Sequence, residues 1–337
     1  MATQHLIRVP ASMDFGGTLE LLGLLEVAPA VELYLFDFGE MSWVTPLGLV
    51  LGSTILRQFR SERQRAKFTA LNFDETGYPA QMGFFQAFGL PKGKAPGQAP
   101  GGHTYEPITC ISLADLYSDA RAARQPVQEA IDRRAIAITR VLTRADSGPL
   151  ADTLSYSIRE MFRNSAEHSG TTNIWYSAQY WPTKEEVHVA IVDEGVGIRP
   201  TLQRNPHLTI ESDDHALSLA LLPGVSGAAF KGARQYDTDV WQHSGYGLFM
   251  TSRLCASGGR FFIGSGVAGL ILDGARKERL HFPFAGVAIE LVLSTKNLPA
   301  LCDSLEALNR EGTAIAKNLR GTPLDATTAS RMLIRDQ

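Results

Sequence analysis

The sequence predicts a mixed α/β (α+β) protein with two domains, and three observations support this fold class. A chain of 337 residues is longer than a domain with a single hydrophobic core usually is, so about two domains are expected. In the N-terminal part, a strand-like segment at 31–38 is followed by helical spacing at 46–60 and a second strand-like segment at 67–73. In the C-terminal part, a helical segment at 152–169 precedes apolar, strand-like segments. Alternation of this kind is typical of layered α/β domains.

The composition argues against several classes of partner. Its 44% apolar and 20% charged residues are typical of a soluble globular protein, and a net charge of −3 gives no electrostatic footprint for nucleic acid or anionic lipid. Cys110, Cys255 and Cys302 lie far apart without metal-ligand spacing, which favours a reducing compartment. No signal peptide is predicted, and the longest apolar run, 44–56, is too short and polar to span a bilayer. We therefore expect a cytoplasmic protein that binds neither nucleic acid nor membrane.

The boundary between the two domains is predicted near residue 100. Residues 91–104 are rich in proline and glycine and almost free of apolar side chains, as in a loop or linker. Residues 112–143 have a helical composition. The expected division is a first domain at 1–100, a linker and helix at 101–150, a second domain at 151–295, and a helical tail at 296–337.

Within the second domain, the helix over 152–169 is expected to begin with Asp152 as its cap and to stop at Gly170. A hairpin is expected around 182–184. The expected strands are 172–181 and 186–192 on the two sides of this hairpin, followed by 260–265, 268–273 and 286–294.

A carboxylate and an amide share one face of the 152–169 helix. Glu160 and Asn164 are four residues apart, so their side chains lie about 5–6 Å from each other. Such a pair can supply a general base and an oxygen ligand for Mg²⁺. The alternative is an ordinary exposed polar face. His168 extends this face, either beside the reacting groups or as a cap.

An acid stands at the end of the apolar segment 187–192 and leads into a Gly-x-Gly turn. The segment reads Asp193-Glu194-Gly195-Val196-Gly197. The glycines let the backbone pass close to a flat ligand, because no Cβ interferes. A tight turn without a ligand is the alternative.

A pair of glycines opens a later helix, in the segment Ser244-Gly245-Tyr246-Gly247-Leu248. Backbone amides at the start of a helix form a site for anions such as phosphate. The sequence has no Gly-x-x-x-x-Gly-Lys-Ser/Thr, so a P-loop is excluded.

Together and in this order, the three segments resemble the N, G1 and G2 boxes of the GHKL ATPase superfamily, which uses the Bergerat nucleotide-binding fold. The resemblance covers about residues 150–294. It implies binding of ATP with Mg²⁺, in which Asp193 accepts the adenine amino group, Asn164 ligates Mg²⁺ and Glu160 is the catalytic base. Phe249 stands where family members often have a further glycine. The resemblance implies further nucleotide contacts for Gly195, Gly197, Ser244, Gly245, Tyr246, Gly247 and Leu248.

The segment between the second and third boxes has the character of a lid. Residues 198–244 show little strand pattern and are convincingly helical only at 215–222. In GHKL proteins the matching segment covers the phosphates. The candidate phosphate contacts here are residues 224–227, Lys231 and Arg234.

The N-terminal region resembles the STAS domains of anti-sigma-factor antagonists. The stretch FDFGEMSWVTPLGLVLGSTILRQFR is similar to their strand, loop and helix. In that family a loop serine is phosphorylated, whereas Pro46 stands at the corresponding position here. Thr45 and Ser42 are nearby hydroxyls, and both are expected to be ordinary loop residues.

The resemblance implies a switch kinase of the anti-sigma-factor type, which phosphorylates a serine or threonine of a regulatory protein partner. An ATP-gated interaction module with little or no catalysis is the alternative. A sensor-histidine-kinase-like protein is a further alternative, although residues 112–150 contain no histidine to accept phosphate. A homodimer is among the assemblies that the resemblance allows.

Overall fold

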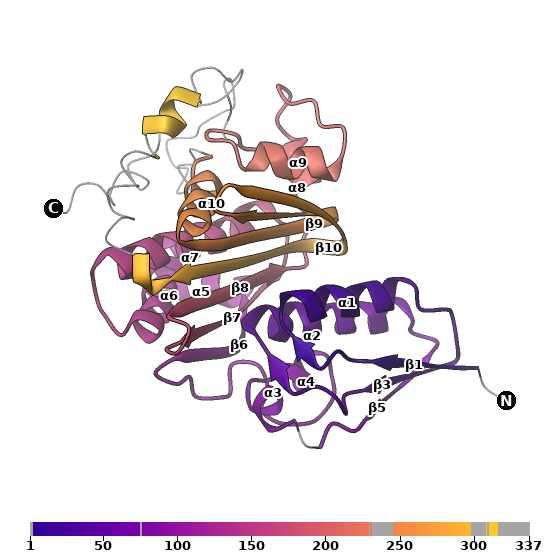
Figure 1. Ribbon diagram of the computed structural model, residues 1–337. Coiled ribbons are helices and arrows are strands. Elements are labelled where there is room, and N and C mark those ends of the chain that lie inside the picture. The colour runs from indigo at the N-terminus through magenta and orange to yellow at the C-terminus, as the bar shows by residue number, and fades with distance from the viewer. Residues whose placement is uncertain are drawn as a thin grey trace. The chain divides into compact units, whose positions relative to one another are not determined.

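The computed structural model describes residues 3–74, 76–228, 230, 245–297, 308 and 310–315. The chain is a mixed α/β protein with both parallel and antiparallel sheets, as predicted at that level (Figure 1). Residue contacts divide it into two compact units. The first contains Met1–Cys110, Trp175–Gln179 and His188–Val192, and the second contains the remaining segments. The predicted domain boundary at residue 100 stays a prediction.

The N-terminal part of the first unit is built around a parallel sheet in the order β1-β3-β5. The predicted strand–helix–strand succession is confirmed here as β3, α2 and β5. Aromatic packing explains why the apolar alternation of β3 forms a strand: Tyr34 and Phe36 are both buried and stack on Phe68. The elements of this part are β1 (Gln4–Arg8), β2 (Ser12–Met13), α1 (Phe15–Glu26), β3 (Leu33–Asp37), β4 (Trp43–Val44), α2 (Pro46–Glu62), β5 (Lys67–Leu71), α3 (Gly77–Gln81) and α4 (Phe84–Ala87).

The hydroxyl group of Thr45 is committed to the start of α2. Thr45 is buried, its Oγ1 accepts a hydrogen bond from the Gly48 amide at 3.4 Å, and it donates one to the Met13 carbonyl at 3.3 Å. Pro46 follows as the first helical residue, where its missing N–H is not needed. Ser42 is exposed and donates a hydrogen bond to the Ala11 carbonyl. Thr45 therefore acts as a helix cap.

The second sheet has five strands in the order β6-β7-β8-β10-β9. The strands predicted at 260–265 and 268–273 prove to be one continuous strand, and the strand predicted at 286–294 begins earlier. Glycines do not break β9; a Cβ at Gly264 would lie only 2.3 Å from the Phe282 ring, so the glycine makes room for that ring. The strands are β6 (Tyr105–Ser112), β7 (Asn173–Trp181), β8 (Glu186–Asp193), β9 (Gly259–Asp273) and β10 (Arg276–Ser294), with β9 and β10 antiparallel.

The helical run predicted over 112–143 is interrupted at Pro126, which precedes the second of two helices. These helices are α5 (Leu113–Ala122) and α6 (Val127–Thr143). α6 packs against α7 (Pro149–His168), the helix that carries Glu160 and Asn164. The prediction that Asp152 caps α7 is wrong. The helix starts at Pro149, Gly148 is the cap, and the Asp152 amide already donates to the Gly148 carbonyl.

Further helices of the second unit are α8 (Ile198–Leu202), α9 (Asp213–Ala220) and α10 (Gly247–Gly258), and residues 310–315 are also helical. α10 packs against α7, β9 and β10, whereas α9 packs against α8 and β9. Lys231, Arg234 and Ser244 lie outside the described residues, as does most of the predicted tail at 296–337. Among the described residues, no helix is both long enough and apolar enough to cross a bilayer.

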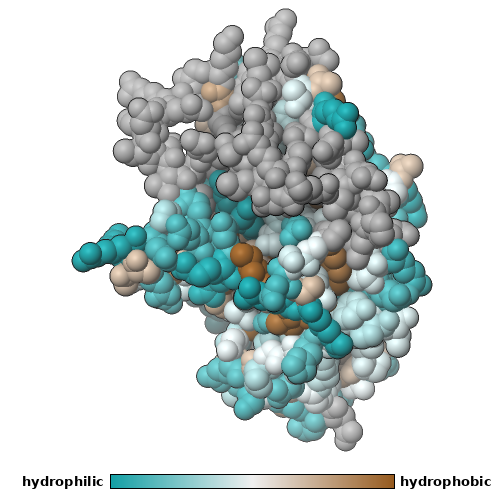
Figure 2. Space-filling view, turned by 90° about the vertical axis from the view of Figure 1, so that its left-hand side faces the viewer, coloured by the Kyte–Doolittle hydropathy of each residue, from teal (hydrophilic) through white to brown (hydrophobic). Residues whose placement is uncertain are grey.

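Most large apolar side chains of the described residues are buried, and the face drawn in Figure 2 is largely hydrophilic. Small, separated hydrophobic areas remain on this face (Figure 2). Single exposed apolar residues such as Val27 and Val267 are ordinary for folded proteins.

Candidate functional site

A cavity in the second unit collects most of the residues predicted to form the site. The space between its walls, counted together with the open solvent at its mouth, is about 910 Å³. Gly195 and Tyr246 are not among its lining residues, and Ser244 lies outside the described part of the chain. The predicted residues that line the cavity are Glu160, Asn164, Asp193, Gly197, Gly245, Gly247 and Leu248.

Asp193 is a buried acid at the end of β8. Its side chain accepts hydrogen bonds from Ser165 Oγ at 2.8 Å and from the Gly195 amide at 3.0 Å, and the residue is only 2% exposed. Burial raises the pKa of the Asp193 carboxyl to about 6, against the opposing effect of these two hydrogen bonds. Asp193 is therefore mostly ionised at neutral pH and has remaining lone pairs for a ligand.

Ser165 is a site residue to which the three sequence motifs assign no role. It follows Asn164 directly on α7, lines the cavity, and donates its hydroxyl hydrogen bond to Asp193. A hydroxyl group among the apolar, buried positions of this helix could have pointed to Ser165, because buried polar groups need hydrogen-bond partners. Its partner could not be identified without the position of β8 relative to α7.

The Gly-x-Gly turn after Asp193 closes β8 onto the end of α7. A Cβ at Gly195 would lie 2.3 Å from the Ser169 carbonyl oxygen, and the Val196 amide donates to that same oxygen at 2.7 Å. Gly197 has φ +85°, a conformation that favours glycine. Gly195 therefore permits a close backbone approach, whereas Gly197 also lines the cavity.

Asn164 presents an uncommitted amide to the cavity. Within the described part of the chain, its side chain makes no hydrogen bond, although it lies on the cavity wall. An amide oxygen is a suitable ligand for Mg²⁺ that is otherwise held by phosphates and water. No group of three or more His, Cys, Asp or Glu residues among the described residues could hold a metal ion by itself. The donor set thus fits a cation that arrives with an anionic ligand.

The first turn of α10 forms another part of the cavity wall. Within the described part of the chain, the N-cap residue Tyr246 makes no side-chain capping hydrogen bond to the first backbone N–H groups of this helix. Gly245 has φ +68° and lies against residues 224 and 225, where a Cβ would be 2.8 Å from the Val225 carbonyl oxygen. The Gly224 amide also donates to the Gly245 carbonyl. The predicted lid residues 224–227 therefore lie beside the start of α10, and Val225, Ser226 and Gly227 line the cavity.

Tyr246 anchors α10 through its side chain. The ring is fully buried, and the hydroxyl group donates to the Gly312 carbonyl at 3.5 Å. A nucleotide contact by this side chain is therefore not supported, although the residue sits between two cavity-lining glycines. It packs in a cluster with Tyr156, Phe249, Met250 and Leu254.

Gly247 makes room for the Glu160 carboxylate. A Cβ at this position would lie 2.2 Å from Glu160 Oε2, so the carboxylate sits directly beside the first residue of α10. The absence of a side chain at 247 thus brings the predicted base to the same helix start as the predicted phosphate site.

Substitution by alanine is expected to have different effects at Gly195 and at Gly247. Gly195→Ala meets a backbone oxygen that cannot move easily, so we expect a loss of about 1–3 kcal/mol in the free energy of unfolding. Gly247→Ala meets the end of a long side chain and gains helix propensity, so its stability should stay within about 1 kcal/mol. It should instead displace the Glu160 carboxylate from the start of α10. Urea denaturation of both variants measures the difference, and equal destabilisation of the two would contradict this assignment.

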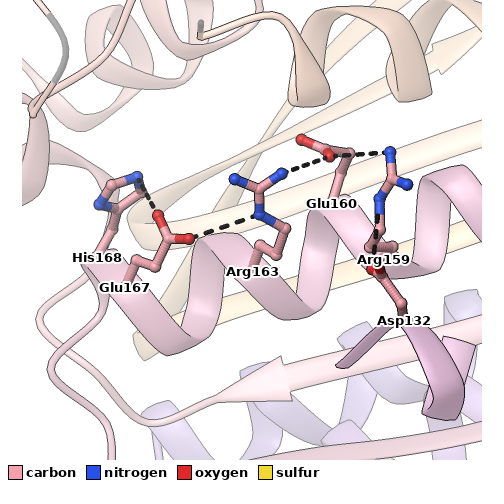
Figure 3. Close-up of polar contacts among 6 residues, drawn as sticks. All are labelled: Asp132, Arg159, Glu160, Arg163, Glu167 and His168. Atoms are coloured by element: carbon pink, nitrogen blue, oxygen red, sulfur yellow. Dashed lines mark hydrogen bonds and ion pairs between the residues drawn. The ribbon is translucent and has the colours of Figure 1, made fainter. Parts of the chain in front are cut away.

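Charged side chains alternate along α7 beside the cavity (Figure 3). Glu160 Oε1 lies 3.3 Å from Arg163 Nη1 and 3.5 Å from Arg159 Nη2. Arg163 Nε lies 3.6 Å from Glu167 Oε1, and Arg159 Nε lies 3.8 Å from Asp132 Oδ1 on α6. Glu160, the predicted base, is therefore held by two guanidinium groups, and Arg163 itself lines the cavity.

His168 ends this row and also lines the cavity. Its Nε2 lies 3.7 Å from Glu167 Oε2. Burial lowers the pKa of His168 to about 4, and the charges of Arg204 and Arg163 act in the same direction. The imidazole is therefore neutral at pH 7, and its contact with Glu167 is not an ion pair at that pH.

We expect His168 to make the free energy of unfolding depend on pH. Because its folded-state pKa of about 4 lies below the ordinary 6.5, the protein loses stability as the pH falls through this window. His168→Gln should remove this loss, so the variant should be more stable than the wild type by about 2–3 kcal/mol at pH 4.5 and similar to it at pH 7.5. Urea denaturation at both pH values measures the difference. A gain of the same size at both pH values would contradict the titration of His168 as its origin.

Comparisons with models of protein families, with curated proteins and with solved structures found no match. The assignment of the site therefore depends on the chemistry of its own residues: a buried carboxylate, an uncommitted amide, an uncapped helix start and a carboxylate held by arginines.

Proposed function

We propose that the cavity binds ATP with Mg²⁺ and that the chain is a regulatory protein of the GHKL type, with a Bergerat-fold ATP-binding domain after a STAS-like module. The observation that carries the proposal is the buried Asp193 carboxylate in the wall of a cavity that is also lined by Asn164 and the start of α10. A buried acid with an open lone pair selects a ligand N–H group, and an uncapped helix start selects an anion. ATP carries both groups at its two ends.

Each part of the site then has a role. Asp193 accepts a hydrogen bond from the adenine amino group, and Ser165 and Gly195 hold the carboxylate in place. The α10 amides and residues 224–227 contact the phosphates, and Asn164 holds the Mg²⁺ that accompanies them. Bound Mg²⁺ supplies neutralisation of phosphate charge.

The reaction that fits this arrangement is phosphoryl transfer to a serine or threonine of a protein partner. The partner's hydroxyl oxygen forms a bond to the γ-phosphorus, and its proton passes to the Glu160 carboxylate. The bond between the γ-phosphorus and the bridging oxygen breaks, and its electron pair leaves with ADP. Glu160 Oε2, which lies beside Gly247, is the oxygen that is not paired with the two arginines.

The second candidate is an ATP-gated interaction module without transfer. The pairing of Glu160 Oε1 with both Arg159 and Arg163 favours it, because the two arginines occupy an oxygen that a general base would need. In this candidate, ATP binding changes a partner-binding surface, and little phosphate is released.

Two measurements test the proposal. Calorimetry with Mg²⁺ should show ATP binding and at least about tenfold weaker GTP binding, because the guanine carbonyl would face the Asp193 carboxylate. Incubation with γ-labelled ATP, alone and with candidate partners, separates the two candidates: label on a partner indicates a kinase, and binding without label or free phosphate indicates a binding module. Absence of ATP binding, or equal binding of GTP, would refute the site assignment.

A further inference from the structure

We propose that Arg163 is a positioning residue that holds Glu160 in a closed ion pair and so protects bound ATP from hydrolysis in the free protein. This inference rests on the proposed function and adds a regulatory role at the same site. It assigns a role to a residue between Glu160 and Asn164 for which the three sequence motifs imply none.

The pair is enclosed and on the cavity wall. The side chains of Glu160 and Arg163 are each only 11% exposed, and both residues line the cavity. Arg163 Nη1 donates to Glu160 Oε1 at 3.3 Å, and Arg159 reaches the same oxygen from one residue earlier (Figure 3). On its other side the carboxylate lies against Gly247. The Glu160 carboxylate is therefore in contact on two sides, with the arginines and with Gly247.

Arg163 is itself fixed from the opposite end. Its Nε lies 3.6 Å from Glu167, whose side chain is 4% exposed and lies four residues further along α7. The guanidinium is thus placed between two carboxylates of one helix, at spacings i−3 and i+4. Because three charges of one rigid helix fix this geometry, Arg163 keeps it without help from the ligand.

The arrangement opposes proton transfer to Glu160. In hydrolysis, a water oxygen would bond to the γ-phosphorus, the water proton would pass to Glu160, and the bond to the bridging oxygen would break to release ADP. Arg163 and Arg159 both contact Oε1 of Glu160, so this oxygen cannot accept the water proton while the two ion pairs are closed. Opening a charge-assisted hydrogen bond corresponds to about a ten- to hundredfold effect on an equilibrium. Turnover in the free protein is slowed accordingly.

The test uses the full chain with Mg·ATP. The double variant Arg163→Met/Glu167→Gln removes the clamp without leaving Glu167 as an uncompensated buried charge. Phosphate release should rise about ten- to hundredfold in kcat over Glu167→Gln alone, with KM changed by less than about threefold. Adding Glu160→Gln to the double variant should abolish the rise. Arg140→Met, which removes an exposed arginine of α6 paired with Asp146, is the control and should leave turnover unchanged.

Other outcomes distinguish this inference from the proposed function. If calorimetry shows ATP binding but the double variant has unchanged or lower kcat, Arg163 is not a clamp. If the rise persists with Glu160→Gln, it does not act through Glu160, and the inference is overturned. Should the double variant fail to fold by circular dichroism, Arg159→Met tests the same oxygen: a several-fold rise in kcat supports the clamp, and no rise contradicts it. Failure of the wild type to bind ATP would refute the proposed function itself.

Discussion

Asp193→Asn is expected to weaken ATP binding strongly and, at the same time, to stabilise the free protein at pH 7.5. The two effects share one cause, which is the burial of a charge whose best partner is a ligand. Asp193 is 2% exposed and has a pKa raised from 3.8 to about 6, chiefly by burial. Opposite signs for stability and binding distinguish a residue kept for a ligand from one kept for the fold.

The stability gain follows from proton linkage. A raised folded-state pKa means that Asp193 lowers stability as the pH rises from 3.8 to about 6, and that the full loss is present above this window. The difference between the two pKa values corresponds to about 3 kcal/mol, which is an upper bound on the gain in Asp193→Asn. The asparagine keeps both local hydrogen bonds, because its oxygen can accept from Gly195 and its amide can donate to Ser165.

The binding loss follows from the hydrogen-bond inventory. The loss of a charge-assisted bond to the adenine amino group weakens affinity about ten- to a hundredfold, and an asparagine amide facing that group would add a donor–donor clash. Calorimetry at pH 7.5 and urea denaturation without nucleotide measure the two effects. In the wild type, affinity should also fall about tenfold between pH 7 and pH 5 as Asp193 becomes protonated, whereas the variant should show no such dependence. A variant that binds ATP normally, or that is strongly destabilised, would refute the base-recognition role.

Much of the site could be predicted from the sequence, because its residues lie in a few short segments of the chain. Glu160 and Asn164 belong to one helix, and the glycines at 197, 245 and 247 meet steric or backbone demands that no other residue meets well. Their convergence on one cavity could be expected from the family resemblance, and the structure places most of them on its wall. Which ligand they bind stays a prediction.

What could not be predicted depends on contacts between distant segments. Two strands, at 260–265 and 268–273, are expected from the sequence where the structure has the single strand β9, which pairs with β10 on both sides of residues 266–267. Ser165 has no evident partner until β8 brings Asp193 within 2.8 Å. Tyr246 stands inside a glycine motif, yet its ring is taken by a hydrophobic cluster. In each case a local sequence pattern allowed more than one interpretation, and only packing between distant segments decides which structure forms.

Glu160→Gln and Asn164→Ala are expected to separate chemistry from binding. Glutamine has the size of glutamate, fits beside Gly247, and can still accept a hydrogen bond from Arg163, so the helix and ATP affinity should be retained. It cannot take the proton of the attacking hydroxyl group, so phosphoryl transfer to a partner should fall by about 10²–10⁴.

Asn164→Ala removes an amide that makes no side-chain hydrogen bond within the described part of the chain, so the fold should tolerate it. The variant should still bind the nucleotide but should lose much of the Mg²⁺ dependence of that binding, because an oxygen ligand is missing. Calorimetry with and without Mg²⁺, together with transfer of labelled phosphate, distinguishes the variants. If Glu160→Gln kept full transfer, the proton would have another acceptor, and the Glu160 carboxylate would serve only the ion pairs along α7.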